Sequence, residues 1–218
     1  MSRFYIFAGG RTTLRTVRKV MADYDGKYKI IAADAGLNAL HKLGIKPDIL
    51  LGDFDSVDDE ILDLYTGDKS IFLEQFPSHK DYTDMELAMD LALREYADDI
   101  VIFGATGTRM DHVLGSIGSL HTALKTGVRA RIVDANNVIE MIGPGRYELK
   151  KSEMFGKYVS LLPYTKKVSG VTLKGFVYNL DDAKLKRGSS LGVSNEIEKD
   201  EASIEFSDGI LIFIQSKD

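Results

Sequence analysis

The 218-residue sequence contains no cysteine, which excludes disulfides, thiolate nucleophiles and cysteine-ligated zinc. No apolar run approaches the roughly 20 residues of a membrane-spanning helix, and the first ten residues lack a signal-peptide pattern. The 28 basic residues are dispersed and are outnumbered by 33 acidic ones, which argues against nucleic acid as a main partner. We therefore expect a soluble cytoplasmic protein that binds neither nucleic acid nor membrane.

The chain length and a hydrophobic content of 44% predict one large and one small domain, each with its own core. In residues 1–137, strand patterns alternate with helix patterns, which predicts an α/β domain with a mostly parallel sheet. In residues 138–218, short strand patterns separated by turn residues predict a smaller all-β, sandwich-like domain.

The expected elements can be given as residue ranges. In the first domain the strands are 3–8, 28–33, 48–51, 70–76, 99–103 and 129–133. The helices are one capped by Thr12 or Thr13 that reaches about Asp23, 37–43, 58–65, one that begins at Thr83, and one capped by Asp111 that ends near Lys125. In the second domain the strands are 138–142, 146–149, 158–162, 168–173, 175–178, 190–193, 202–206 and 210–214.

Two carboxylates, Asp53 and Asp55, follow a short buried strand that Gly52 ends. Side chains two residues apart in extended chain point the same way, and a pair of carboxylates without a neighbouring histidine or cysteine suits Mg²⁺. Ordinary turn and helix-cap chemistry explains the same residues. This segment alone leaves both interpretations open.

Other strands of the predicted sheet also end in polar groups, and ligands of α/β sheets bind beyond the carboxyl ends of the strands. The groups are Gly9-Gly10, Asp34, Asp53 with Asp55, Lys80 with Asp81 and Asp84, and Arg109 with Asp111. Five such strand ends favour a functional site over turn chemistry. Carboxylates that hold Mg²⁺, two cations and glycine loops suit phosphoryl or diphosphoryl transfer.

Several common motifs are missing. There is no Gly-x-x-x-x-Gly-Lys-Ser/Thr, no Gly-x-Gly-x-x-Gly after a strand and no His-Glu-x-x-His. His112 is expected to pack or to form a hydrogen bond in the first turn of a helix rather than to bind metal. Thr83 and Glu86 match a helix capping box.

Blocks of residues along nearly the whole chain resemble the thiamine pyrophosphokinase family. In the first domain these blocks are residues 33–36, 47–48, 52–56, 76–77, 80–84 and 104–112. In the second domain they are residues 160–163, 170–172, Gly175 and 192–196. Each block alone is weak, but together and in order they are specific.

The resemblance implies transfer of a diphosphoryl group from ATP to the hydroxyl of thiamine, which gives thiamine diphosphate and AMP. It implies a requirement for Mg²⁺ and a homodimer with the active site at the subunit interface. By the same resemblance, Asp53, Asp55 and Asp84 hold Mg²⁺ and act with Asp111 in catalysis. The ATP and polyphosphate side consists of Asp34, Lys80, Asp81, Thr83, Arg109, Asp111 and His112, and the thiamine side includes Ser194 and Asn195.

Two departures from the family pattern accompany the resemblance. Some members place a tryptophan against thiamine, and this chain has none, so another residue must cover the ring. Thr108 precedes Arg109 where many members have glycine.

Three other functions stay open. They are a diphosphokinase for another hydroxymethyl heteroaromatic such as a pterin, a Mg²⁺-dependent phosphohydrolase, and a non-catalytic nucleotide sensor. The Ser194-Asn195 pair favours thiamine over a pterin, and the complete set Asp53, Asp55 and Asp84 argues against the sensor.

Overall fold

The computed structural model describes residues 2–77 and 81–218, which form two compact units, Met1–Ala135 and Asn136–Asp218. The N-terminal unit has an α/β fold with a parallel sheet, and the C-terminal unit is built from antiparallel strands, so the expected fold class is confirmed. Within the described residues, no helix has both the length and the apolar character needed to cross a membrane.

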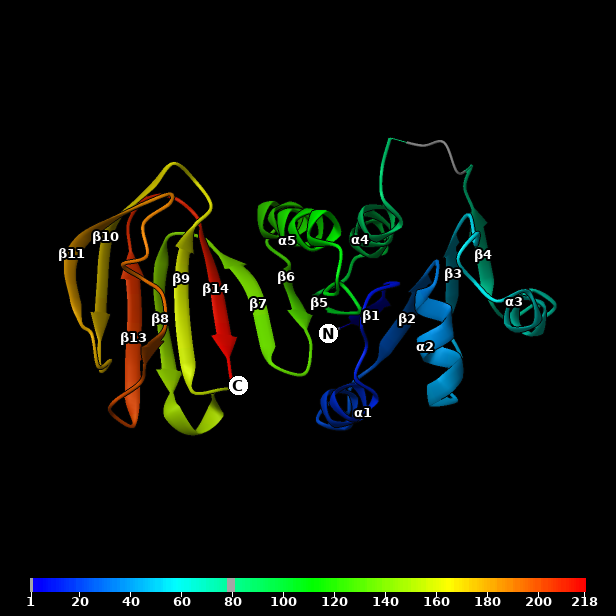
Figure 1. Ribbon diagram of the computed structural model, residues 1–218, viewed down its shortest axis with the longest axis horizontal. Helices are drawn as coiled ribbons and strands as arrows, with labels where there is room; N and C mark the ends of the chain where they lie inside the picture. Colours follow the sequence, from blue (N-terminus) through cyan, green and yellow to red (C-terminus); the bar gives the residue numbers. More distant parts are fainter. Residues whose placement is uncertain (1, 78–80) are drawn as a thin grey trace. The chain divides into compact units, whose positions relative to one another are not determined.

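The sheet of the N-terminal unit has the strand order β6-β5-β1-β2-β3-β4, and all of its neighbouring strands are parallel (Figure 1). Its strands are β1 (Arg3–Phe7), β2 (Tyr28–Ala33), β3 (Ile49–Gly52), β4 (Phe72–Gln75), β5 (Asp99–Phe103) and β6 (Arg129–Val133). Strands β1, β3 and β5 are buried almost throughout, because helices cover both faces of a parallel sheet.

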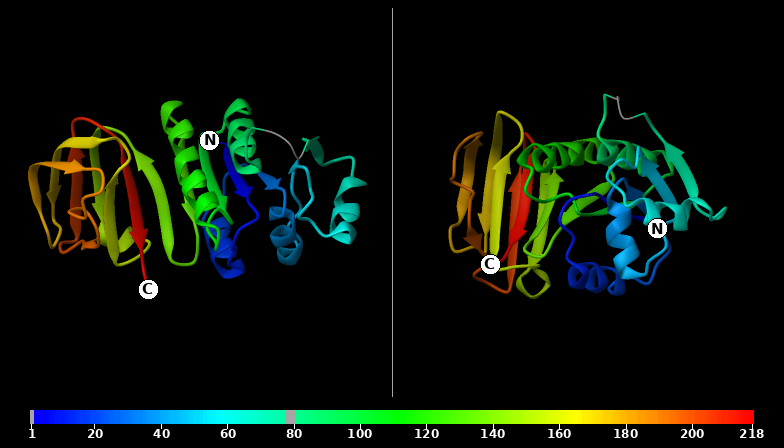
Figure 2. Two further views of the ribbon diagram at one scale, coloured as in Figure 1. Left: turned by 45° about the horizontal axis from the view of Figure 1, so that its top comes forward. Right: turned by 45° about the vertical axis from the view of Figure 1, so that its right-hand side comes forward.

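The helices of this unit are α1 (Leu14–Ala22), α2 (Gly36–Leu43), α3 (Asp59–Thr66), α4 (Asp84–Arg94) and α5 (Met110–Lys125). The chain moves from β1 to β4 in one direction across the sheet and then returns to the other side of β1 with β5 and β6. Because such crossovers are right-handed, α1 and α2 lie on one face and α4 and α5 on the other (Figures 1 and 2). The reversal creates a topological switch point between β1 and β5.

The C-terminal unit consists of two antiparallel sheets. One has the order β12-β9-β14-β7, with β7 (Asn137–Ile142), β9 (Tyr158–Pro163), β12 (Asn195–Glu196) and β14 (Leu211–Ser216). The other has the order β11-β10-β13-β8, with β8 (Gly145–Lys150), β10 (Lys167–Lys174), β11 (Leu180–Lys186) and β13 (Glu201–Phe206). A short 3₁₀ helix, η1 (Lys151–Glu153), follows β8. Side chains of both sheets share one apolar core, as in a β-sandwich.

Two expected strands of this unit are wrong, and two strands were missed. Residues 175–178 and 190–193 form no named strand, although Phe176 makes an isolated bridge to Ile197, and β11 and β12 were not expected. Residues 175–178 look like a strand in the sequence because they include three large apolar or aromatic residues. Only Phe176 of these is fully buried in the core, whereas Tyr178 is 69% exposed. Strand β11 alternates in burial, with Leu185 inside and Lys186 outside, but its charged residues hide this pattern in the sequence.

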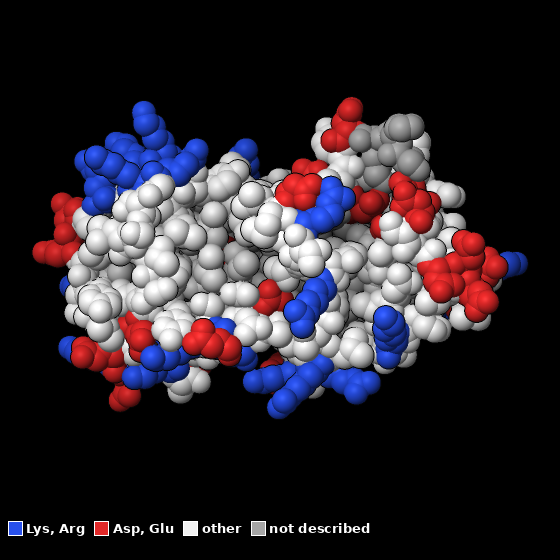
Figure 3. All heavy atoms as spheres, in the orientation of Figure 1, with Lys and Arg blue, Asp and Glu red and all other residues white. Residues whose placement is uncertain are grey.

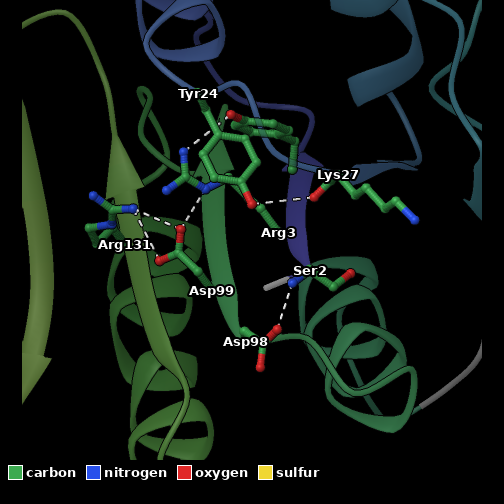
Figure 4. A network of polar contacts seen from close by, with 8 residues as sticks. Ser2, Arg3, Tyr24, Lys27, Asp98, Asp99 and Arg131 are labelled. Carbon is green, nitrogen blue, oxygen red and sulfur yellow. Dashed lines mark hydrogen bonds and ion pairs between the residues drawn. The ribbon is translucent and has the colours of Figure 1, made fainter.

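A buried ion-pair network joins β1, β5 and β6 near their amino-terminal ends (Figure 4). Arg3 Nε lies 2.6 Å from Asp99 Oδ2, and Arg131 Nη2 lies 2.9 Å from the same oxygen. The guanidinium carbon of Arg3 is 3.8 Å from the ring centre of Tyr24. Because Asp99 is only 7% exposed, its charge depends on these two arginines for compensation.

We expect Asp99→Asn to lower the free energy of unfolding by about 2–3 kcal/mol, since it leaves two partly buried arginines without their carboxylate. The neighbouring Asp98 is exposed and accepts a hydrogen bond from the Ser2 backbone nitrogen, so Asp98→Asn is the matched control. The control should change stability by only about 0.5 kcal/mol. Urea unfolding followed by circular dichroism measures both, and equal losses would contradict the role given to Asp99.

Candidate functional site

Three carboxylates converge at the carboxyl ends of the neighbouring strands β2 and β3. One oxygen from each of Asp34, Asp53 and Asp55 lies within 4.8 Å of the other two. The strand register brings them together: Ala33 pairs with Leu51, and the backbone nitrogen of Asp34 continues the ladder with a 2.8 Å hydrogen bond to Leu51 oxygen. We call these three residues the acid cluster.

The backbone around the acid cluster is strained. Asp34 and Phe54 have φ angles of 47° and 63°, in the left-handed region that a phenylalanine rarely adopts. Gly52 has φ 147°, and a Cβ atom there would lie 3.2 Å from Asp34 Cα. Gly36 is required because a Cβ atom would collide with the Phe7 carbonyl oxygen. These conformations bring β3 and the start of α2 close to Asp34.

The Asp34 carboxyl lies among other acidic side chains and is half-buried. Burial raises the pKa of the Asp34 carboxyl, a hydrogen bond from the Ala35 backbone lowers it, and the charges of Asp84, Asp53 and Asp55 raise it. The Oδ1 atom of Asp34 is buried and has no hydrogen-bond partner among the described residues. Three hard oxygen donors and one orphaned carboxylate oxygen fit a divalent cation such as Mg²⁺.

Asp84 begins α4, and the helix cap in front of it uses the side chain of Thr83. Thr83 Oγ1 accepts a 3.2 Å hydrogen bond from the backbone nitrogen of Glu86, and a Glu86 carboxylate oxygen accepts a 2.9 Å bond from the Thr83 backbone nitrogen. The predicted capping box is therefore confirmed. Asp84 acts electrostatically on Asp34 but is not one of the three clustered carboxylates, whereas the sequence had grouped Asp84 rather than Asp34 with the metal.

The glycine loops after β1 and β5 pack directly on each other at the switch point. The backbone nitrogen of Gly10 donates to Gly104 oxygen and that of Arg11 to Thr106 oxygen, both at 2.7 Å. A Cβ atom at Gly10 would collide with both of these carbonyl oxygens. These glycines thus allow close loop packing, and the two amide groups are already engaged and do not form an open anion cradle.

Arg109 and Asp111 form an exposed pair at the start of α5. Arg109 Nη2 lies 2.6 Å from Asp111 Oδ2, and its Nε lies 3.3 Å from Oδ1. This pairing lowers the pKa of Asp111 to about 2. His112 follows in the same first turn and is exposed, as is Asp81. Lys80 lies outside the described residues.

In the C-terminal unit the Asn195 side chain is committed to the protein itself. Its Oδ1 accepts from the Tyr178 backbone nitrogen at 3.0 Å, and its Nδ2 donates to the Tyr178 oxygen at 2.7 Å. Ser194 is exposed with φ 57°, and its backbone nitrogen donates to Ser160 Oγ at 3.0 Å. The two predicted residues are adjacent, but only Ser194 is exposed, since Asn195 is 6% exposed.

Tyr178 is an exposed aromatic residue beside Asn195 that the sequence pattern did not single out. Its ring is 69% exposed, and its backbone is held at both polar groups by Asn195. Other exposed apolar side chains in this unit include Val177, Leu191 and Val193. An aromatic residue between Val177 and Asn179 is visible in the sequence. Because residues 175–178 were expected to form a strand, Tyr178 was not recognised as part of an exposed turn.

The protein thus has two units, and the N-terminal one has an acidic site suited to a cation at the carboxyl ends of its parallel strands. The family model for the thiamin pyrophosphokinase catalytic domain matches residues 24–132, and that for the thiamin pyrophosphokinase vitamin B1 binding domain matches residues 146–211. The chain therefore belongs to the thiamine pyrophosphokinase family, and it is an enzyme of that kind.

Comparison with individual proteins gives the same family. The chain is 38% identical to thiamine pyrophosphokinase of Bacillus subtilis over 86% of this chain and 87% of that protein. The crystal structure of the Bacillus subtilis thiamine pyrophosphokinase superposes with a TM-score of 0.89 at 34% identity and covers 100% of both chains. The thiamin pyrophosphokinase of Geobacillus thermodenitrificans superposes with a TM-score of 0.82 at 33% identity and covers 100% of this chain and 98% of that one.

The like charges around Asp34 lead to a stability prediction. At pH 7 and without metal, Asp34→Asn should raise the melting temperature by about 2 °C or more, because it removes like-charge repulsion and asparagine tolerates a positive φ. The gain should shrink as the pH falls, because the folded wild-type protein then relieves the repulsion by binding a proton at its raised pKa. Thermal unfolding monitored by circular dichroism between pH 4.5 and 7.5 measures both effects.

Adding about 10 mM Mg²⁺ should raise the melting temperature of the wild type more than that of the Asp34→Asn variant. A variant that melts below the wild type at pH 7 without metal would contradict the account of Asp34.

Proposed function

We propose that the protein transfers the diphosphoryl group of ATP to the hydroxyl of thiamine and releases thiamine diphosphate and AMP, with Mg²⁺ as the required ion. The observation that carries the proposal is the acid cluster, with its orphaned Asp34 oxygen, in a chain of the thiamine pyrophosphokinase family. Diphosphoryl transfer needs such a site, because a polyphosphate must be neutralised and oriented before it reacts.

In this proposal Asp34, Asp53 and Asp55 hold the ion, with Asp84 adding negative charge beside them. Bound Mg²⁺ would neutralise polyphosphate oxygens and polarise the phosphoryl group. The left-handed backbone at Asp34 and Phe54 sets the course of the two loops that carry the carboxylates, which reduces the reorganisation needed during the reaction.

The polyphosphate would extend from the acid cluster toward Arg109, whose planar guanidinium suits two phosphate oxygens at once. Asp111 holds that guanidinium now, so it would orient Arg109 and share it with the nucleotide. The ATP side of the site would also include Lys80, Asp81, Thr83 and His112. The Thr83 hydroxyl already serves the α4 cap, so we assign Thr83 to fixing the position of Asp84.

The chemical step would be in-line attack of the thiamine hydroxyl on the β-phosphorus, with AMP as the leaving group. A loose phosphoryl-type transition state needs little help from a base, so positioning and charge stabilisation carry most of the rate. We therefore assign no general base.

Thiamine would bind in the C-terminal unit, where Ser194 is exposed and Asn195 holds Tyr178 in place. Tyr178 would cover the ring, the task that a tryptophan performs in some members of the family. Its exposed aromatic face gives a flat surface for a cationic heteroaromatic ring. Asn195 would act through Tyr178 rather than touch the substrate.

The proposal includes a homodimer with the active site at the subunit interface and a cytoplasmic location. Met110 and Leu114 on the first turns of α5 are 61% and 64% exposed, and a second copy would cover such apolar side chains. Light scattering would then give a mass twice the 24.2 kDa of one chain.

The reaction is tested by mass spectrometry of products after incubation of the purified protein with Mg·ATP, with and without thiamine. We expect AMP and thiamine diphosphate in equal amounts, formed only when thiamine is present. Asp55→Asn should lower the rate about 100-fold or more, by analogy with the loss of one preorganised electrostatic contact. Asp63→Asn, at an exposed position on α3, is the matched control and should keep the wild-type rate.

Other products would point to the alternatives. AMP or ADP formed equally without thiamine would indicate a phosphohydrolase, and transfer to a pterin alcohol in preference to thiamine would indicate another diphosphokinase. Tight ATP binding without any product would indicate a sensor. Each of these results would overturn the proposed reaction.

The role of Tyr178 has its own test. Tyr178→Ala should raise the KM for thiamine about 10-fold or more, since one aromatic contact contributes roughly 1.4 kcal/mol to binding. Tyr178→Phe keeps the ring and should stay within about 3-fold of the wild type. The KM for ATP should be unchanged in both variants. Equal KM values for thiamine in the alanine variant and the wild type would remove Tyr178 from the site.

A further inference from the structure

Two side chains outside the acid cluster connect the two loops that carry it. Asn38 lies on α2, one helical turn after Asp34, and its Nδ2 donates to the carbonyl oxygen of Ser56 at 3.4 Å. Ser56 follows Asp55 directly in the chain. Asn38 therefore ties α2, which begins two residues after Asp34, to the loop that contains Asp53 and Asp55.

Ser56 continues this connection into the carboxylates. Its Oγ donates to Asp55 Oδ1 at 2.8 Å, and the backbone nitrogen of Asp55 donates to Asp53 Oδ1 at 3.3 Å. Each acid of the loop thus accepts a hydrogen bond that fixes one of its oxygens. A continuous chain of contacts runs from Asn38 through Ser56 and Asp55 to Asp53.

The acid cluster needs such a restraint, because three carboxylates within 4.8 Å repel one another. Asp55 and Ser56 are exposed, so packing does little to hold them. Nothing in the apolar core prevents the Asp55 side chain from turning toward water. A hydrogen bond from Ser56 is the contact that opposes this movement.

Asn38 also carries a cost that stability alone does not explain. Its Oδ1 atom is buried and has no hydrogen-bond partner among the described residues. A buried acceptor without a partner lowers the free energy of unfolding. The Asn38 amide is thus held through its Nδ2 contact with Ser56, and its Oδ1 adds no hydrogen bond of its own within the described part of the chain.

We propose that Asn38 and Ser56 are positioning residues that hold the Asp53–Asp55 loop against Asp34 in the geometry that binds the divalent cation. This inference rests on the proposed function, since it takes the acid cluster to be the cation site. Neither residue touches the ion. Both act through the carboxylates, as hydrogen-bond partners of metal ligands commonly do.

The test uses Mn²⁺ alone as the probe, because Mn²⁺ prefers the same oxygen ligands as Mg²⁺ and its free form gives a paramagnetic resonance signal. Titration of the full-length protein should give a dissociation constant that rises about 10-fold or more in Ser56→Ala and in Asn38→Ala. The melting temperature of the metal-free variants should stay within about 3 °C of the wild type.

Two controls separate positioning from general loss of structure. Ser56→Thr keeps the hydroxyl and should restore Mn²⁺ affinity to within about 3-fold of the wild type. Ser70→Ala removes a bond of the same kind, from Ser70 Oγ to Asp68 Oδ1 at 2.7 Å, at the opposite end of the sheet. It should leave the Mn²⁺ affinity unchanged.

Wild-type affinity in both Ser56→Ala and Asn38→Ala would overturn the inference, while formation of thiamine diphosphate by the same proteins would leave the proposed function standing. Equal losses in Ser56→Ala and Ser70→Ala would also overturn it, because the effect would not be local. Failure of the wild type to bind Mn²⁺ would overturn the cation site and this inference together.

Discussion

Repulsion among three carboxylates at the ends of β2 and β3 is the constraint on which the rest of the site depends. Parallel pairing forces Asp34 next to the Asp53–Asp55 loop, and left-handed backbone at Asp34 and Phe54 keeps the acids facing one another. Burial and like charges raise the pKa of Asp34 in the folded chain. The N-terminal unit therefore folds with an unfavourable charge cluster that a bound cation would relieve.

Stability must come from elsewhere in the unit to offset that cost. Strands β1 and β5 are almost wholly buried, and the Asp99 network compensates a buried charge near the amino-terminal ends of the strands. Figure 3 shows acidic side chains gathered over α3 and basic side chains over the ends of β10 and β11. The Asp99 network and the acid cluster lie at opposite ends of the parallel strands, and substitutions at one end should leave the other intact.

Much of this could be predicted from the sequence, because strand ends and helix caps are local signals. The Thr83 capping box, the parallel sheet and the convergence of Asp34 with Asp53 follow from them. Strand ends do not give the distances between the acids: the structure brings Asp34 within 4.8 Å of Asp53 and Asp55, and the assignment of Asp84 to the metal stays a prediction. The exposed ring of Tyr178 was not singled out because the apolar residues around the buried Phe176 resemble a strand. Tertiary packing, which no local pattern encodes, decides both cases.

We propose that Asp34, Asp53 and Asp55 hold a divalent cation. Anomalous diffraction from a crystal grown with Mn²⁺ and a non-hydrolysable ATP analogue tests it most directly. The account predicts a strong anomalous peak within about 2.5 Å of an oxygen of each of the three carboxylates, with phosphate oxygens completing the ligand set. No peak at the acid cluster, or a peak held by other residues, would contradict it.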